Sequence, residues 1–107
     1  MTRPTYTQVF QEIQHAFEAQ NNPKQALQMK AYMLNQFEFI GMRATPRRQT
    51  LKTVVQAWPK STFTRTVVLS LVKQLWQLPA REYQYAAIDL LDWHHKDLQM
   101  QDIEALL

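Results

Sequence analysis

The chain has 107 residues, of which 46% are hydrophobic and 20% are charged, a balance typical of one globular domain rather than a disordered segment. Its single glycine argues against a β-sandwich, a Rossmann domain or a P-loop, and the lack of cysteine excludes disulfides and thiolate metal sites. The net charge is +3, and no apolar run approaches the roughly 18 residues of a membrane span. We expect a soluble, cytoplasmic, helical domain that does not enter a membrane.

Apolar residues spaced by three and four predict a first helix over residues 5–20. A second helix is expected to start at Pro23, with Asn22 as its N-cap, and to end near Gln36. Its expected buried residues are Ala26, Leu27, Met33, Leu34 and Phe37.

The middle of the chain predicts two further helices. Gly41 is expected where the backbone needs a positive φ. Thr45 is expected to cap a third helix that continues until Pro59. Ser61 or Thr62 is expected to cap a fourth helix, which is apolar nearly all round through Trp76 and is therefore expected to pack on several sides.

Pro79 is expected to open a fifth helix, and residues 97–107 form a weaker sixth segment. Taken in pairs, the helices start at intervals of roughly 35–40 residues, the period of helical-hairpin arrays. We therefore predict an all-α fold, an α-α superhelix of about three HEAT-like hairpins, with residues 1–107 as one domain. The apolar, uncapped stretch Ile103–Leu107 suggests the N-terminal half of a longer array, or an edge where chains self-associate.

Charge is unevenly distributed along the sequence. Residues 39–81 contain eight basic side chains and no Asp or Glu, whereas residues 82–107 contain six acids and one lysine. Such a basic middle favours contact with a polyanion, although a solvated helical surface would show the same pattern.

Two stretches resemble the HEAT-like alkylpurine DNA glycosylases of the AlkD type. One runs from Ala31 to Gly41 and is followed by Thr45-Pro46-Arg47-Arg48, similar to an aromatic-Met pair, a Phe-rich connection, a glycine and Thr-Pro-x-Arg-Arg in the family. The other is Leu75-Trp76-Gln77-Leu78-Pro79-Ala80-Arg81-Glu82-Tyr83-Gln84, similar to the family's Leu-Trp-x-Leu-Pro-x-Arg-Glu-[Phe/Tyr]-Gln. Both occur in the family's order and at its spacing.

The resemblance implies helical hairpins curved around double-stranded DNA and excision of N3- or N7-alkylated purines without metal or cofactor. In the family, the catalytic aspartate and its tryptophans follow the third hairpin. The acids of this chain do not match that motif, so we name no catalytic residue and expect this chain alone to be inactive. His94 and His95 point about 100° apart on a helix and predict no metal site.

The candidate DNA-binding residues are Tyr32, Arg43, Arg47, Arg48 and Lys52. Tyr32 corresponds to an aromatic that borders the DNA groove in the family, and its ring face would suit a cationic base. Arg47 and Arg48 open the third helix, where backbone N–H groups also attract phosphate. The alternatives are a core-edge position for Tyr32, partial packing for Arg47 and a solvated surface for the arginines.

Arg81, Glu82 and Asp89 are interpreted as structural, with Asp89 linking adjacent helices. Two rival functions stay open at this point. One is a non-catalytic helical scaffold that binds protein, and the other is a catalytically silent DNA-binding relative.

Overall fold

The computed structural model describes residues 5–94, which form a bundle of α-helices without a β-strand. The elements are α1 (Thr5–Glu18), α2 (Pro23–Tyr32), α3 (Ala44–Gln56), the 3-10 turn η1 (Lys60–Thr62), α4 (Arg65–Trp76) and α5 (Arg81–Trp93). The all-α class is confirmed. The sixth helix predicted over residues 97–107 lies outside the described residues, so the predicted C-terminal edge and its self-association stay predictions.

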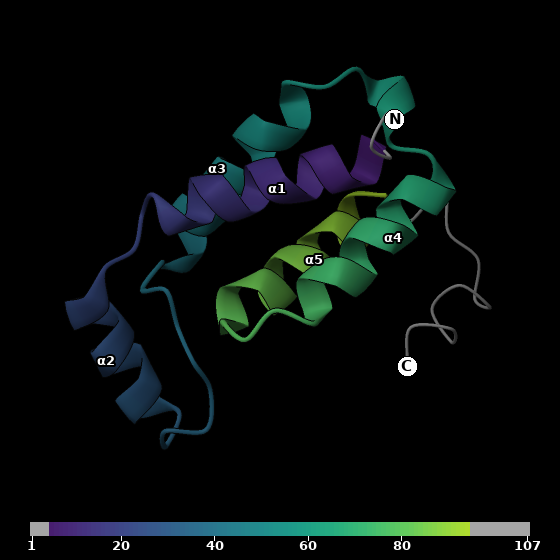
Figure 1. Cartoon of the computed structure of the whole chain (residues 1–107). Coiled ribbons are helices and arrows are strands. Elements are labelled where there is room, and N and C mark those ends of the chain that lie inside the picture. The colour runs from purple at the N-terminus through teal and green to yellow at the C-terminus, as the bar shows by residue number, and fades with distance from the viewer. Residues whose placement is uncertain (1–4, 95–107) are drawn as a thin grey trace.

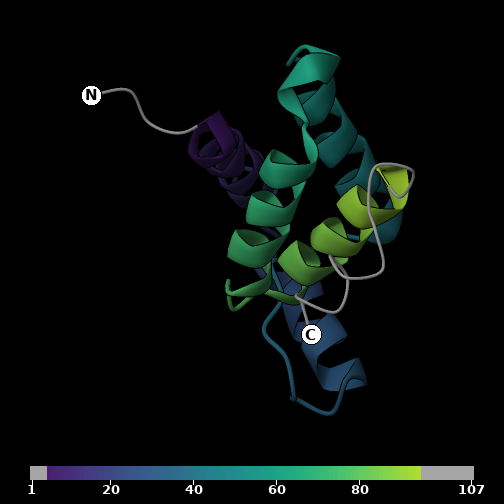
Figure 2. The same cartoon turned by 90° about the vertical axis from the view of Figure 1, so that its right-hand side faces the viewer.

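Four helices share one hydrophobic core. α1 packs against α3 and α4, and α5 packs against α4 and α3 (Figures 1 and 2). The apolar stripe of α1 supplies Val9, Ile13 and Phe17, all fully buried, as the sequence pattern predicted. The ring of Phe17 stacks on that of Tyr83, with centroids 5.3 Å apart, which joins the first helix to the last described one.

α4 is buried on two sides, because α1 and α5 both pack against it. Val68, Leu71, Val72 and Leu75 face these neighbours, as expected of a helix packed on several sides. Trp76 at its end is exposed, so the apolar surface is not covered all round in the described part.

α2 stands apart from the four-helix core in both views (Figures 1 and 2) and buries no residue. The predicted burial of Leu27 and Leu34 is therefore wrong, since their side chains are 69% and 78% exposed. The helix also ends earlier than predicted, at Tyr32 rather than near Gln36. Leu34 and Asn35 adopt left-handed backbone angles (φ 58° and 59°), which a right-handed helix cannot contain.

Three predicted helix starts are shifted, and one of them is that of α5, which begins at Arg81 after Ala80 rather than at Pro79. α3 begins at Ala44 after Arg43, so Thr45 lies inside the first turn and does not cap it. Pro46 is still tolerated there, because N–H groups of the first turn have no partner within a helix. α4 is capped by Thr64, whose hydroxyl accepts from the Val67 N–H at 3.3 Å, and not by Ser61 or Thr62. Those two residues form η1 together with Lys60, and Phe63, which follows it, is buried in the core.

Gly41 has a positive φ of 103°, as predicted. A Cβ at this position would collide with the carbonyl oxygen of Asn22 and lie 3.0 Å from the Ala26 nitrogen. The chain leading out of α2 therefore passes directly against the start of α2, where the Asn22 N–H donates to the Ile40 carbonyl at 2.9 Å.

Candidate nucleic-acid interface

A buried carboxylate fixes the connection between α2 and α3. Glu82, the second residue of α5, is fully buried and accepts hydrogen bonds from three consecutive backbone N–H groups. The donors are Ile40 (3.0 Å), Gly41 (2.8 Å) and Met42 (3.1 Å). Negative charge is also favoured here by the N-terminal end of α5. The structural interpretation of Glu82 is confirmed, because its carboxylate ties residues 40–42 of the connection to the start of α5.

A second polar group joins α3 to α5. Arg47 is only 7% exposed; its guanidinium lies 4.9 Å from the Tyr85 ring centroid, and its Nη2 is 3.6 Å from Asp89 Oδ2. Arg48 approaches the other oxygen of Asp89 at 3.8 Å, but 60% of its side chain remains exposed. The linking role predicted for Asp89 is confirmed. The alternative of a packed Arg47 is also confirmed.

Arg81 connects the same region to the chain that follows α2. Its guanidinium lies 4.2 Å from the Phe37 ring centroid and 5.5 Å from that of Tyr85. Its backbone N–H donates to the Glu38 carbonyl at 2.8 Å. The ring of Tyr85 therefore lies near two guanidinium groups, that of Arg47 from α3 and that of Arg81 from its own helix.

Sequence reasoning assigned no role to Tyr85 and expected Phe37 only as a buried residue of the second helix. The signal for Tyr85 was present, because Arg81, Tyr85 and Asp89 are each four residues apart and so occupy one face of α5. Nothing in the local sequence predicts that Phe37 folds back under Arg81, since that contact depends on where the α2–α3 connection crosses α5.

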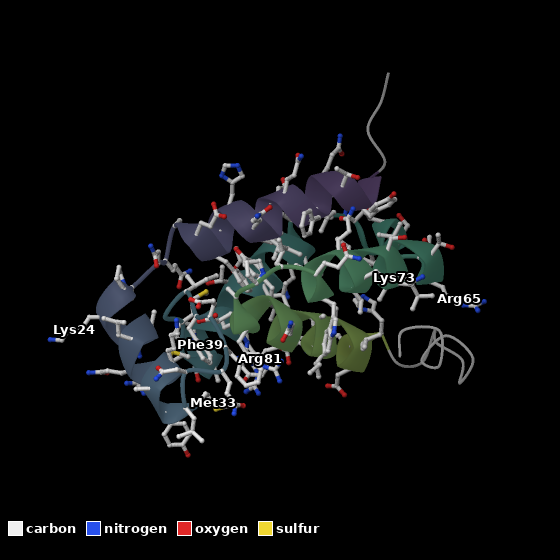
Figure 3. All side chains as sticks on the ribbon, turned by 60° about the horizontal axis from the view of Figure 1, so that its bottom comes forward. Lys24, Met33, Phe39, Arg65, Lys73 and Arg81 are labelled. Carbon is white, nitrogen blue, oxygen red and sulfur yellow. The ribbon has the colours of Figure 1, made fainter. Side chains whose placement is uncertain are left out.

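Tyr32 and Arg43 border a single hollow of about 360 Å³ between α2 and α5. Tyr32 is 86% exposed and is not a core-edge residue. Apart from Tyr32 and Arg43, the hollow is lined by apolar and amide side chains. Tyr85 lines it from α5, and the others are Gln25, Gln28, Met29, Met33 and Phe39. Figure 3 shows Met33 and Phe39 at this place, beside Arg81.

Arg43 also borders a second, more polar hollow together with Lys24. With its amide turned so that the nitrogen donates to the Gly41 carbonyl (3.1 Å), Gln25 accepts from Arg43 Nη2 at 3.2 Å. Arg43 therefore borders both hollows, whereas Lys24 borders only the second one.

Lys52 lies elsewhere, one turn beyond Arg48 on α3. It lines a hollow of about 590 Å³ walled by Trp58, Phe63 and Trp93, and Lys60 lines it too. The structure therefore brings Tyr32 together with Arg43, and Arg47 together with Arg48. It separates Lys52 from Tyr32.

The eight basic residues of the middle region do not all lie on one face. Arg65 and Lys73 belong to α4, far from Lys24 and Arg81 in Figure 3. Of the eight, only Arg43, the residue before α3, lines the hollow that Tyr32 borders, so the charge of the middle region as a whole does not define this surface.

The fold and this surface define a class: small all-helical domains in which exposed cations accompany an exposed aromatic, a combination typical of proteins that bind nucleic acid. Residues 13–107 match the family model described as DNA alkylation repair enzyme, and the chain belongs to that family. Its general role is therefore DNA repair, with DNA as the partner. No curated protein sequence matches the chain. Across residues 5–94, no helix is long and apolar enough to cross a bilayer.

Proposed function

We propose that the chain supplies the DNA-binding portion of a cytoplasmic glycosylase that excises N3- or N7-alkylated purines from duplex DNA, and that its helix pairs are HEAT-like hairpins. The observation that carries this proposal is the shared hollow of Tyr32 and Arg43 in a member of the DNA alkylation repair family. An exposed aromatic face beside a cation suits a DNA surface that presents both bases and phosphates.

Each candidate residue has a separate part in this proposal. Tyr32 faces the alkylated base, whose positive charge is attracted by the negative face of an aromatic ring. Arg43, Arg48 and Lys52 contact phosphates, because all three are exposed and lie on or next to α3. Arg47 is buried and does not itself contact DNA in this proposal. It packs on Tyr85 and pairs with Asp89, which also lies near the exposed Arg48.

Alkylation at N3 or N7 places a positive charge on the purine, so the glycosidic bond breaks with the base leaving as a neutral group. The sugar then carries oxocarbenium-like positive charge, which a carboxylate stabilises while water attacks. The resemblance places that carboxylate after the third hairpin. We therefore assign binding, and no bond-breaking step, to residues 5–94.

The first test measures affinity for a duplex that contains one 7-methylguanine, by fluorescence anisotropy across a salt series. Phosphate contacts predict a linear fall of log affinity with log salt. Arg43→Ala and Lys52→Ala should each reduce the magnitude of that slope by about one contact, roughly 0.9. Lys73→Ala removes the same charge from α4 and serves as the matched control, which should bind like the unmodified chain.

Three results would remove parts of the proposal. If the chain shows no salt-dependent binding to DNA, the alternative of a protein-binding scaffold is favoured. The exposed side chains of Leu27 and Leu34 support that alternative. An equal loss in Lys73→Ala would mean that net charge, and not the surface around α3, determines affinity. Equal affinity of Tyr32→Ala and the unmodified chain for the alkylated duplex would remove Tyr32 from the interface.

A further inference from the structure

The hollow beside Lys52, which we call the tryptophan hollow, combines aromatic and cationic side chains from three elements. It has a volume of about 590 Å³, and the end of α3, η1 and the end of α5 all contribute to it. Three rings and two ammonium groups line it: Trp58, Phe63, Trp93, Lys52 and Lys60. Its volume falls within the range of small-molecule and cofactor sites, about 300–1,000 Å³. It shares no lining residue with the hollow that Tyr32 borders, so the two are separate sites.

Trp93 is the aromatic residue of this hollow that the fold does not use. Its side chain is 40% exposed and makes no hydrogen bond or ring contact within residues 5–94. Trp58, by contrast, packs against the core and donates its indole N–H to Glu12 on α1. An indole ring left in water forgoes the free energy of burial, which a flat ligand stacked on it would recover.

The cations of the tryptophan hollow have no acidic partner in the described part of the chain. Lys52 and Lys60 are both exposed, and neither forms an ion pair within residues 5–94. No carboxylate from those residues lines the hollow. Arg48, which is also exposed, lies one turn before Lys52, so cations follow one another along α3 up to the hollow. The complementary ligand is therefore an anion.

One partner satisfies the rings and the charges together. The stacked bases of a duplex offer phosphates but no free ring face, and an apolar peptide offers no anion to the lysines. An unpaired nucleotide offers both, because its base has open faces and its phosphate carries negative charge. Proteins that bind single strands use this same combination of a cationic groove and aromatic side chains.

We propose that the tryptophan hollow binds an unpaired nucleotide of a DNA strand, with the base stacked on Trp93 and the phosphates of the strand at Lys52 and Lys60. This inference rests on the DNA-binding function proposed above, in which Lys52 already contacts a phosphate. It adds a preference for a single-stranded extension beside the duplex, and it requires no alkylated base in the hollow.

The test compares duplexes that differ only at one end, by fluorescence anisotropy with the whole chain. One is blunt, one has a short overhang of thymidines, and one has an overhang of abasic units of the same length. The two overhangs carry the same phosphates, so the ratio of their affinities isolates the contribution of the bases. Stacking of one base predicts that the thymidine overhang binds about fivefold more tightly than the abasic one, or more.

Matched variants locate the contact. Trp93→Leu should abolish the preference for thymidine, whereas Trp76→Leu removes another exposed tryptophan, outside the hollow, and should keep it. Lys60→Gln should weaken binding of both overhang duplexes and leave the blunt duplex unchanged, and Lys73→Gln on α4 is its control. If circular dichroism shows that Trp93→Leu does not fold, the Lys60→Gln comparison decides, because Lys60 is exposed in η1.

The outcomes separate the tryptophan hollow from the function beneath it. Salt-dependent binding of the blunt duplex with equal affinity for the two overhangs overturns the hollow as a nucleotide site, leaves it to an apolar protein segment and keeps the proposed DNA binding intact. A preference that persists in Trp93→Leu, or that Trp76→Leu also loses, overturns it as well. Absence of salt-dependent binding to any of the duplexes overturns both proposals.

Discussion

Removing the Glu82 carboxylate is expected to destabilise the fold more than any other single change to a charged side chain in residues 5–94. In Glu82→Ala, the N–H groups of Ile40, Gly41 and Met42 lose their acceptor while still buried. A buried donor without a partner costs about 1–3 kcal/mol, so the three together cost about 3–6 kcal/mol after partial entry of water. A domain of this size has a total stability of about 5–15 kcal/mol, so the variant should be near its unfolding threshold.

Urea unfolding followed by circular dichroism measures this loss. Glu82→Gln keeps one acceptor oxygen but points an NH₂ group at the same donors, so it should fall between the alanine variant and the unmodified chain. Glu38→Gln is the control, because Glu38 pairs with Lys30 at the surface and should lose about 0–1 kcal/mol. A loss below about 1 kcal/mol in Glu82→Ala would refute the reasoning, since it would mean that water replaces the carboxylate at no cost.

Three further outcomes are expected. Gly41→Ala should lower the free energy of unfolding by about 3 kcal/mol or more, because it combines a positive φ with a backbone collision; an unchanged urea midpoint would contradict this. Burial, reinforced by Glu18 and Glu82, raises the pKa of Tyr83 above its ordinary 10.0, so the unfolded chain ionises first. The stability from this residue is present below pH 10 and should be lost as the pH rises further, and alkaline melts of Tyr83→Phe should lack that component. Asp89→Ala leaves the Arg47 guanidinium buried without its partner and should cost about 3 kcal/mol, against about 0–1 kcal/mol for Arg48→Ala in the same urea assay.

Helices whose apolar residues repeat at helical spacing and are covered by neighbouring helices were predictable from the sequence. The stripe of α1 and the apolar residues of α4 and α5 repeat at helical spacing, and each helix has neighbours that cover the stripe. The positive φ of Gly41 was predictable for a different reason, because the sequence contains no other glycine. In these cases the local chemistry and the tertiary contacts favour the same structure.

The prediction failed where long-range contacts decide the outcome. Leu27 and Leu34 belong to an apolar pattern, yet no residue of α2 is buried in the described part, so the pattern does not lead to burial. Arg47 carries the same local signals as Arg48, and only the position of Asp89 and Tyr85 on α5 separates a buried arginine from an exposed one. The N-caps of α3 and α4 lie two or three residues from the predicted ones, and at α4 the reason is similar, since Phe63 reaches the core before the helix begins.

The candidate site depends on α5, although the helix residue that matters most, Glu82, is fully buried. Glu82 and the backbone N–H of Arg81 fix the connection that leaves α2, and the Arg81 guanidinium holds Phe37 within it. Tyr85, on the same helix, forms the wall opposite Tyr32. The position of Tyr32 relative to α3 is therefore set by a helix about fifty residues later in the sequence. The two motifs that indicated the family are thus physically coupled: the second holds the first in the geometry that its proposed contact with DNA requires.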